Sequence, residues 1–279
     1  SSTATATVSY VLPPSTLSLN PATASACIGD APFLLRATGG TVGPTTVNSG
    51  VVTIPGTISA LGTIAHGVTV AGIPAGAVIT GASVNVINFG AAWQDDYVIN
   101  IKAPNGNVLN LINQRGTHTS TVTTLFDNTN VSSLGTASLG TGSGTFTGTW
   151  AADAASGVGA APHVANVSTW PSLYSIPNGT WTLSIYNNTA FSNTVIPNMQ
   201  WSVTLHYTWQ APVTFAPLTN LYTDAAATTA YTGTAADSVY FSPATAGATT
   251  ITATANNAGC TSAATSALTV NVTPSAITG

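Results

Sequence analysis

The segment WSVTLHYTW, residues 201–209, alternates strictly between large apolar side chains and small or polar ones. Alternation with a period of two predicts a half-buried β-strand, with one face on a core and the other turned away from it. No turn residue interrupts the pattern before Trp209. Local sequence therefore leaves open which domain contains the end of this strand.

Composition extends the β prediction to the whole chain. Only 4% of the 279 residues are charged, there is no Glu, and Arg36, Lys102 and Arg115 are the only Lys or Arg residues. Glu and Lys are favoured on exposed helices, so their scarcity argues against substantial helix. Thr, Ser, Ala, Gly, Asn and Val dominate instead, which is typical of strands and turns. We predict an all-β protein.

The charge balance also excludes classes of partner. The net charge is −4 with three cations, too few to neutralise a nucleic-acid backbone or to favour an anionic membrane. The charge-free stretch 37–94 is broken by Pro44, Pro55, Pro74 and many Gly. It contains no apolar run of about 18 residues, so we expect no membrane insertion.

Two similar segments lie at the ends of the chain. Residues 1–14 and 261–274 each begin with Ser, Thr and Ala, continue as an alternating strand and end in Pro. We interpret the chain as one period of a tandem array. Residues 1–13 would then be the last strand of a preceding repeat, and 274–279 a linker to the next. Shared composition alone is the alternative explanation.

The chain has two cysteines, Cys27 and Cys260, near opposite ends. They could be free and buried. In an uncharged, Thr-rich chain of extracellular type, a disulfide between them is the favoured interpretation.

The middle block resembles the P domain that accompanies proprotein convertases and many secreted bacterial proteases. The similar segments are QDDYVINIKAPNGNVLNLINQRG (94–116), FDN (126–128) and the run from Pro177 to Tyr207 that contains NGTWTLSIYN and WSVTLHY. Ala103 replaces the usual Ser, and Asn128 stands where a second acid is common. The resemblance implies a jelly-roll β-sandwich over 46–207, with Trp181 and Trp201 in its core.

The flanking segments resemble Ig-like repeats of large surface proteins of Bacteroidota. The similarity rests on the order of Cys27, ATGG (37–40), YTWQAP (207–212), AGC (258–260) and a final alternating strand. It implies a discontinuous Ig-like β-sandwich, 14–45 plus 208–273, that carries the P-domain-like block as an insertion. Trp209 is then assigned to the Ig-like core beside Cys27 and Cys260.

Calcium is the cofactor that the P-domain resemblance implies. Carboxylate and amide oxygens suit this ion, and the candidate ligands fall at expected loop positions of the block: Asp95, Asp96, Asp127, Asn128 and Asp153. The alternative is that Asp95 and Asp96 only form a turn ahead of a strand.

Surface glycans are the rival candidate ligands. Trp93, Tyr97 and Trp150 lie outside the clearest alternating strands, where aromatic rings could bind sugars, although packing on the sandwich is the alternative. The tripeptide DSV (237–239) also matches the O-glycosylation pattern of Bacteroidota, which makes Ser238 a candidate modification site.

Catalytic motifs are missing. None of the four histidines has metal-ligand spacing, and there is no GxSxG or phosphate-binding loop. We therefore predict a non-enzymatic structural or adhesive module of an extracellular, cell-surface protein or filament, with neighbouring repeats as partners. The alternative is an accessory, carbohydrate-binding region of a secreted hydrolase.

Overall fold

The computed structural model describes residues 11–54, 56–90, 96–114, 120–127, 144–190, 194–195 and 198–274. Within these ranges the protein is all-β, as the composition predicts, and it also contains the 3-10 helix η2, Trp170–Leu173. None of the described segments is a helix long and apolar enough to cross a bilayer. The predicted strand over 1–13 and linker over 274–279 lie almost entirely outside the described residues.

The chain forms two compact units. Unit 1 comprises Ser1–Gly43 and Thr208–Gly279, and unit 2 comprises Pro44–Tyr207, against the predicted insertion over 46–207. Two strands cross the boundary, β4 (Thr41–Asn48) and β15 (Met199–Gln210). The long alternating run of the sequence thus corresponds to a single strand shared by both units.

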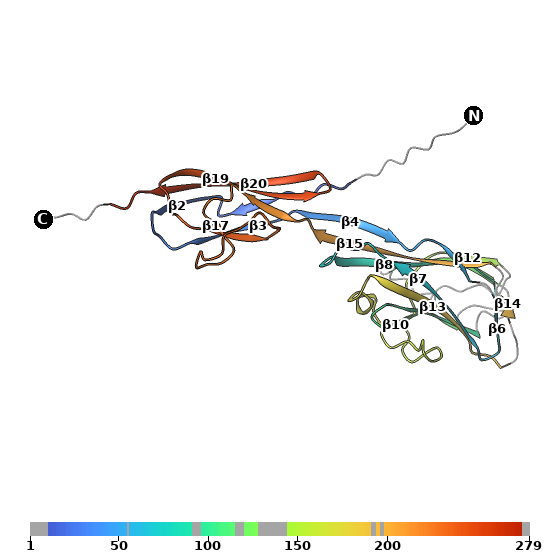
Figure 1. The fold of residues 1–279 in the computed structure, drawn as a ribbon. Coiled ribbons are helices and arrows are strands. Elements are labelled where there is room, and N and C mark those ends of the chain that lie inside the picture. The colour runs from blue at the N-terminus through green and yellow to red at the C-terminus, as the bar shows by residue number, and fades with distance from the viewer. Residues whose placement is uncertain are drawn as a thin grey trace, which may run out of the picture. The chain divides into compact units, whose positions relative to one another are not determined.

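Unit 1 is a β-sandwich of two four-stranded sheets, in the orders β1-β3-β18-β17 and β16-β19-β20-β2. Figure 1 shows β19 and β20 as its long hairpin. The strands of the first sheet are β1 (Ser18–Asn20), β3 (Phe33–Thr38), β17 (Leu221–Tyr222) and β18 (Ser238–Phe241). Those of the second are β2 (Thr23–Cys27), β16 (Val213–Ala216), β19 (Gly247–Asn257) and β20 (Cys260–Asn271).

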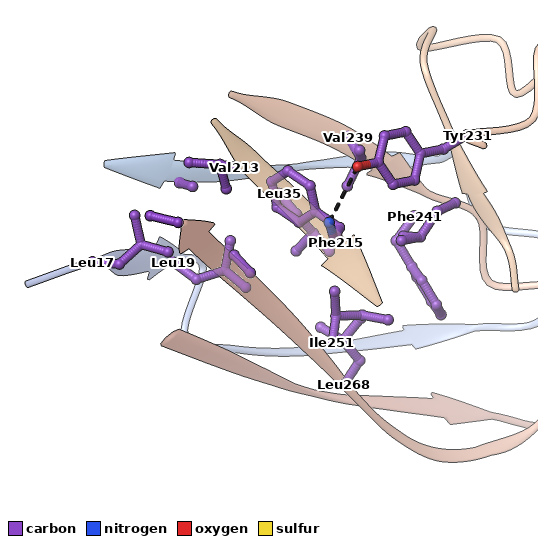
Figure 2. Packing of buried hydrophobic residues seen from close by; sticks show 14 of the residues in the cluster. Leu17, Leu19, Leu35, Val213, Phe215, Tyr231, Val239, Phe241, Ile251 and Leu268 are labelled. Carbon is purple, nitrogen blue, oxygen red and sulfur yellow. Dashed lines mark hydrogen bonds between the residues drawn. The ribbon is translucent and has the colours of Figure 1, made fainter. Parts of the chain in front are cut away.

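The core of unit 1 is filled by alternate residues from both sheets (Figure 2). Leu35 and Val239 come from the first sheet, and Phe215 and Ile251 from the second; all four are buried. The Tyr231 ring packs edge-on against Phe215, with centroids 6.0 Å apart. Trp209 is partly buried against this cluster, which places it with unit 1.

The predicted disulfide is wrong, because both cysteines are free. Cys27 ends β2, which runs parallel to β20 and places Cys27 opposite Asn271. Cys260 is the first residue of β20, eleven positions before Asn271. At about 3.3 Å per residue the two cysteines are separated by about 36 Å, whereas a disulfide needs Cα atoms within about 7 Å.

Unit 2 contains a four-stranded sheet in the order β10-β9-β13-β7. It also contains a six-stranded sheet in the order β12-β11-β8-β15-β4, in which β5 pairs with β15 as well. The strands β14 and β6 form a further small sheet. The first sheet is built from β7 (Thr63–Val70), β9 (Tyr97–Lys102), β10 (Val108–Asn113) and β13 (Gly179–Asn187). The remaining strands are β5 (Val52–Ile54), β6 (Thr57–Ile58), β8 (Val78–Gly90), β11 (Ser120–Asp127), β12 (Gly144–Trp150) and β14 (Thr194–Val195).

The largest buried side chains of unit 2 come from both sheets. Trp181 on β13 and Trp201 on β15 have no exposed surface, and the Trp181 indole donates to the Pro177 carbonyl at 2.9 Å. Phe89 on β8 and Tyr97 on β9 meet edge-on with ring centroids 5.4 Å apart. These large side chains make unit 2 a second sandwich with its own core.

The turn between β9 and β10 is the one that the segment APNGN (103–107) predicts. Gly106 adopts φ +89°, a conformation that favours glycine. The Ala103 amide donates to the Asn107 carbonyl at 2.9 Å, which closes the loop. This hairpin sets the pairing of β9 with β10, on which the candidate site depends.

Candidate functional site

One face of the β10-β9-β13-β7 sheet carries a row of buried polar residues. Asn110, Asn100 and Ser184 are opposite one another on β10, β9 and β13. Paired residues on neighbouring strands point to the same face of a sheet. Ile101 and Leu183, one position along, point to the opposite, apolar face. Because Asn110, Asn100 and Ser184 are all buried, something must cover this polar face.

The cover is the segment 151–167, which follows β12. Asn110 donates through Nδ2 to Asn100 Oδ1 at 2.8 Å. Asn100 Nδ2 in turn donates to the carbonyls of Val158 at 3.0 Å and His163 at 2.8 Å. A buried hydrogen-bonded chain of this kind gives a segment one preferred position. We infer that the two asparagines hold the covering segment on the sheet.

The covering segment also satisfies the free edge of β10. The backbone amides of Asp153 and Ala154 donate to the carbonyls of Leu111 and Asn110 at 3.1 and 3.0 Å. The Asp153 carboxylate accepts a hydrogen bond from the backbone amide of Asn113 at 2.9 Å. An exposed sheet edge is prone to unwanted pairing, and this segment covers it.

A pocket of about 240 Å³ remains between the sheet and its cover. It lies over the next row of the same face, in which Val98 is paired with Asn113 on one side and Tyr186 on the other. Its lining consists of Val98, Asn113, Gln114, Gly157, Val158, Gly159, Tyr186 and Asn188. The pocket is the candidate functional site of unit 2.

The backbone of the cover approaches the sheet closely at Gly159. A Cβ atom there would collide with the Asn100 amide nitrogen, and the residue adopts φ +102°. Only glycine accommodates both constraints without strain. Gly159 therefore allows Asn100 to hold the backbone that forms one wall of the pocket.

The electrostatics of the site come from neutral groups. None of the eight lining residues carries a charge. Asn113 Oδ1 is a buried oxygen without a hydrogen-bond partner among the described residues, and the same holds for Asn110 Oδ1 in the adjacent row. Nearby, burial and the charge of Lys102 lower the pKa of His163. The pocket is thus lined by uncharged polar and apolar residues.

The structure does not assemble the predicted calcium ligands from described residues alone. Asp127 ends β11, which runs parallel to β12 with Phe126 opposite Trp150, so Asp127 and Asp153 lie toward the same edge of that sheet. The Asp96 carbonyl accepts the Asn188 amide. Asp95 and Asn128 lie outside the described residues, which contain no group of three His, Cys, Asp or Glu able to hold a metal.

Among the described residues, the aromatic side chains predicted to bind sugars do not line the pocket. Tyr97 is 1% exposed and packs on Phe89 in the core, so its ring is not available to a ligand. Trp150 is partly buried at the end of β12, and Trp93 lies outside the described residues. Tyr186, for which the sequence predicts no ligand contact, is the aromatic residue that lines the pocket.

Ser238, the candidate O-glycosylation site, is the first residue of β18, opposite Arg36 of β3. Its side chain is half-buried, between exposed Asp237 and fully buried Val239.

Asn100 and Asn110 were also missed, although the sequence contained a signal for them. Both interrupt apolar runs, and both lie five positions from the centre of the turn at Asn105. A hairpin centred there pairs them, which makes a matched pair of asparagines within two apolar strands detectable.

The chain matches no protein-family model, no curated protein and no solved structure.

Proposed function

We propose that this chain is a non-catalytic structural and adhesive module of an extracellular bacterial surface protein or filament. In this proposal unit 1 is an Ig-like element of a stalk, and unit 2 is a P-domain-like, jelly-roll head that makes contacts. The observation that carries the proposal is the position at which the chain enters and leaves unit 1.

The entry lies at the turn between β19 and β20. Asn257 Nδ2 donates to the Leu12 carbonyl at 2.8 Å, beside the start of β20. The exit lies at the other end of β20, where the Thr273 hydroxyl donates to the Ile28 carbonyl at 2.9 Å just after Asn271. Units joined through these points extend along β20 by about 36 Å each, as in repeat proteins whose units contact only their neighbours.

The connections of unit 2 suit an inserted head. Asn48 Nδ2 donates to the Thr204 hydroxyl on the unit 2 side of the boundary. The Ala211 amide donates to the Gly40 carbonyl at 3.1 Å on the unit 1 side. The first and last residues of unit 2 are therefore neighbours on paired strands. Adjacent ends allow a domain to be inserted without disrupting its host.

The scarcity of charge supports the same proposal. Surface charges normally keep soluble domains apart, and this chain has 4% charged residues. A surface of hydroxyls and amides suits packing against neighbouring repeats, or a coat of glycans attached at sites such as Ser238.

Immunogold labelling of the producing cells tests the proposal. Fab fragments raised against unit 2 should label intact, unpermeabilised cells, along fibres or a surface layer. Fab fragments against a cytoplasmic protein provide the control. Label that appears only after permeabilisation, or that follows a soluble hydrolase, would overturn the proposal.

A further inference from the structure

We propose that the pocket over Val98 binds a single neutral sugar ring. This inference rests on the proposed function of unit 2 as a contact head and names the class of ligand that the head would contact. It uses residues different from Trp93, Tyr97 and Trp150, for which the sequence predicts sugar binding.

The size of the pocket restricts the ligand. Its volume of about 240 Å³ lies below the range of roughly 300–1,000 Å³ found for sites of drug-sized molecules. A single ring fits this space, whereas a longer chain must continue outside it. A terminal sugar of a surface glycan has this geometry.

The absence of charged residues from the pocket lining restricts the class of ligand further. A phosphate or carboxylate would find no cation among the eight lining residues, and burying an unpaired charge is costly. A metal ion would find amide and carbonyl oxygens but no carboxylate there, too weak a set for calcium. A neutral ligand remains.

The polar groups match a ring that carries hydroxyls. The amides of Asn113, Gln114 and Asn188 each supply donors and an acceptor. Gln114 and Asn188 are exposed residues, so their side-chain amides can reach a ligand in the pocket.

Apolar surface is placed to contact the ring. Val98, 3% exposed, lies in the middle of the row, and the half-buried Tyr186 stands beside it on β13. The opposite wall is the backbone at Gly157 and Gly159, part of the covering segment that Asn100 holds through Val158 and His163. Rigid walls of this kind reduce the ordering that binding requires.

The test is a titration of the full chain, followed by backbone amide NMR, with methyl glycosides of neutral hexoses, 6-deoxyhexoses and N-acetylhexosamines. Concentrations should reach about 20 mM, because a ligand of about twelve non-hydrogen atoms that each contribute about −0.3 kcal/mol has a Kd in the millimolar range. We expect at least one glycoside to saturate, with the largest shifts at Val98, Gly157 and Gly159. Sialic acid, glucose 6-phosphate and Ca²⁺ serve as charged comparisons.

Variants identify the site. Asn113→Ala and Tyr186→Ala should each weaken binding at least about tenfold. Tyr186→Phe, which keeps the ring, should retain most of it. Asn48→Ala, an exposed amide on the other sheet, is the matched control and should bind as the parent does. Melting curves confirm that each variant folds, and weakened binding by a Tyr186→Ala variant that melts as the parent does separates a ligand contact from a packing role.

The proposal is overturned if no neutral glycoside shifts these amides, if only a charged ligand does, or if the variants bind normally. Immunogold labelling of cells does not depend on sugar binding. A surface-labelled protein without sugar affinity would therefore remove this inference and leave the proposed function standing.

Discussion

Cys27 and Cys260 lie at opposite ends of β20: Cys27 is opposite Asn271, and Cys260 is opposite Asn257 at the other end. The sheet register holds them about 36 Å apart. Unit 1 is therefore stabilised by its packed core, without a covalent link between its first and last strands.

Replacing both cysteines should leave stability almost unchanged. The variant Cys27→Ser/Cys260→Ser should keep its melting temperature, since substitutions away from a packed core usually change stability by less than about 0.5 kcal/mol. The unfolded parent should react with Ellman's reagent at both thiols before reduction. Loss of a native disulfide would instead cost about 2–5 kcal/mol, and such a loss would contradict the free-thiol state.

Removing the hydroxyl of Tyr231 and removing that of Tyr174 should have different effects on the free energy of unfolding. Tyr231 Oη accepts the Phe215 amide at 3.2 Å and donates to the Thr234 carbonyl at 2.6 Å (Figure 2 shows the first bond). Tyr174 Oη is buried and has no hydrogen-bond partner among the described residues. Burial and the Asp127 carboxylate raise the pKa of its phenol.

Tyr231→Phe should therefore lower the free energy of unfolding by about 1–3 kcal/mol, because the buried Phe215 amide loses its partner. Tyr174→Phe should be neutral or stabilising, because it removes a hydroxyl that gains no bond. Urea denaturation of the two variants beside the parent measures the difference. Equal losses would contradict the assignment.

The stability of unit 2 should fall below neutral pH. Burial first, and the Lys102 charge second, lower the pKa of His163 from its ordinary value of 6.5. The unfolded chain then takes up a proton that the folded chain resists, so the free energy of unfolding decreases as pH falls below 6.5. Above that pH the contribution is fully present.

Urea denaturation between about pH 7.5 and 5.5 measures this slope. His163→Gln should flatten it while keeping the backbone carbonyl that Asn100 binds. Asn48→Ala, which removes no titrating group, is the control and should keep the parental slope. An unchanged slope in His163→Gln would place the pH dependence elsewhere.

Calcium binding by unit 2 remains a prediction from the sequence. If Asp127 and Asp153 contribute to a site, adding calcium after EDTA treatment should raise the melting temperature. The stabilisation should reach about 2.7 kcal/mol at a hundredfold excess over Kd. Asp153→Asn should reduce the response, and Asp224→Asn in unit 1 should not. A melting temperature that changes neither with EDTA nor with added calcium would contradict the prediction.

Local sequence determined the β-class of this chain and much of its organisation. Alternation gives a strand its two faces, and the Asn-Gly turn at 105–106 gives β9 and β10 their pairing, because both effects act within a few residues. The change in pattern near residues 46 and 207 predicted the insertion, and unit 2 spans Pro44–Tyr207. Trp209, ambiguous in the alternating run, packs with the core of unit 1.

The tertiary structure alone decided where the cysteines lie, which way Tyr97 points and how the pocket forms. Each depends on the pairing of distant segments: β2 with β20, β9 with β13, and the 151–167 cover with β10. Alternation fixes the parity of a side chain within its strand, but not the partner strand, the register or the face that is covered. Those are set by the burial of two whole cores.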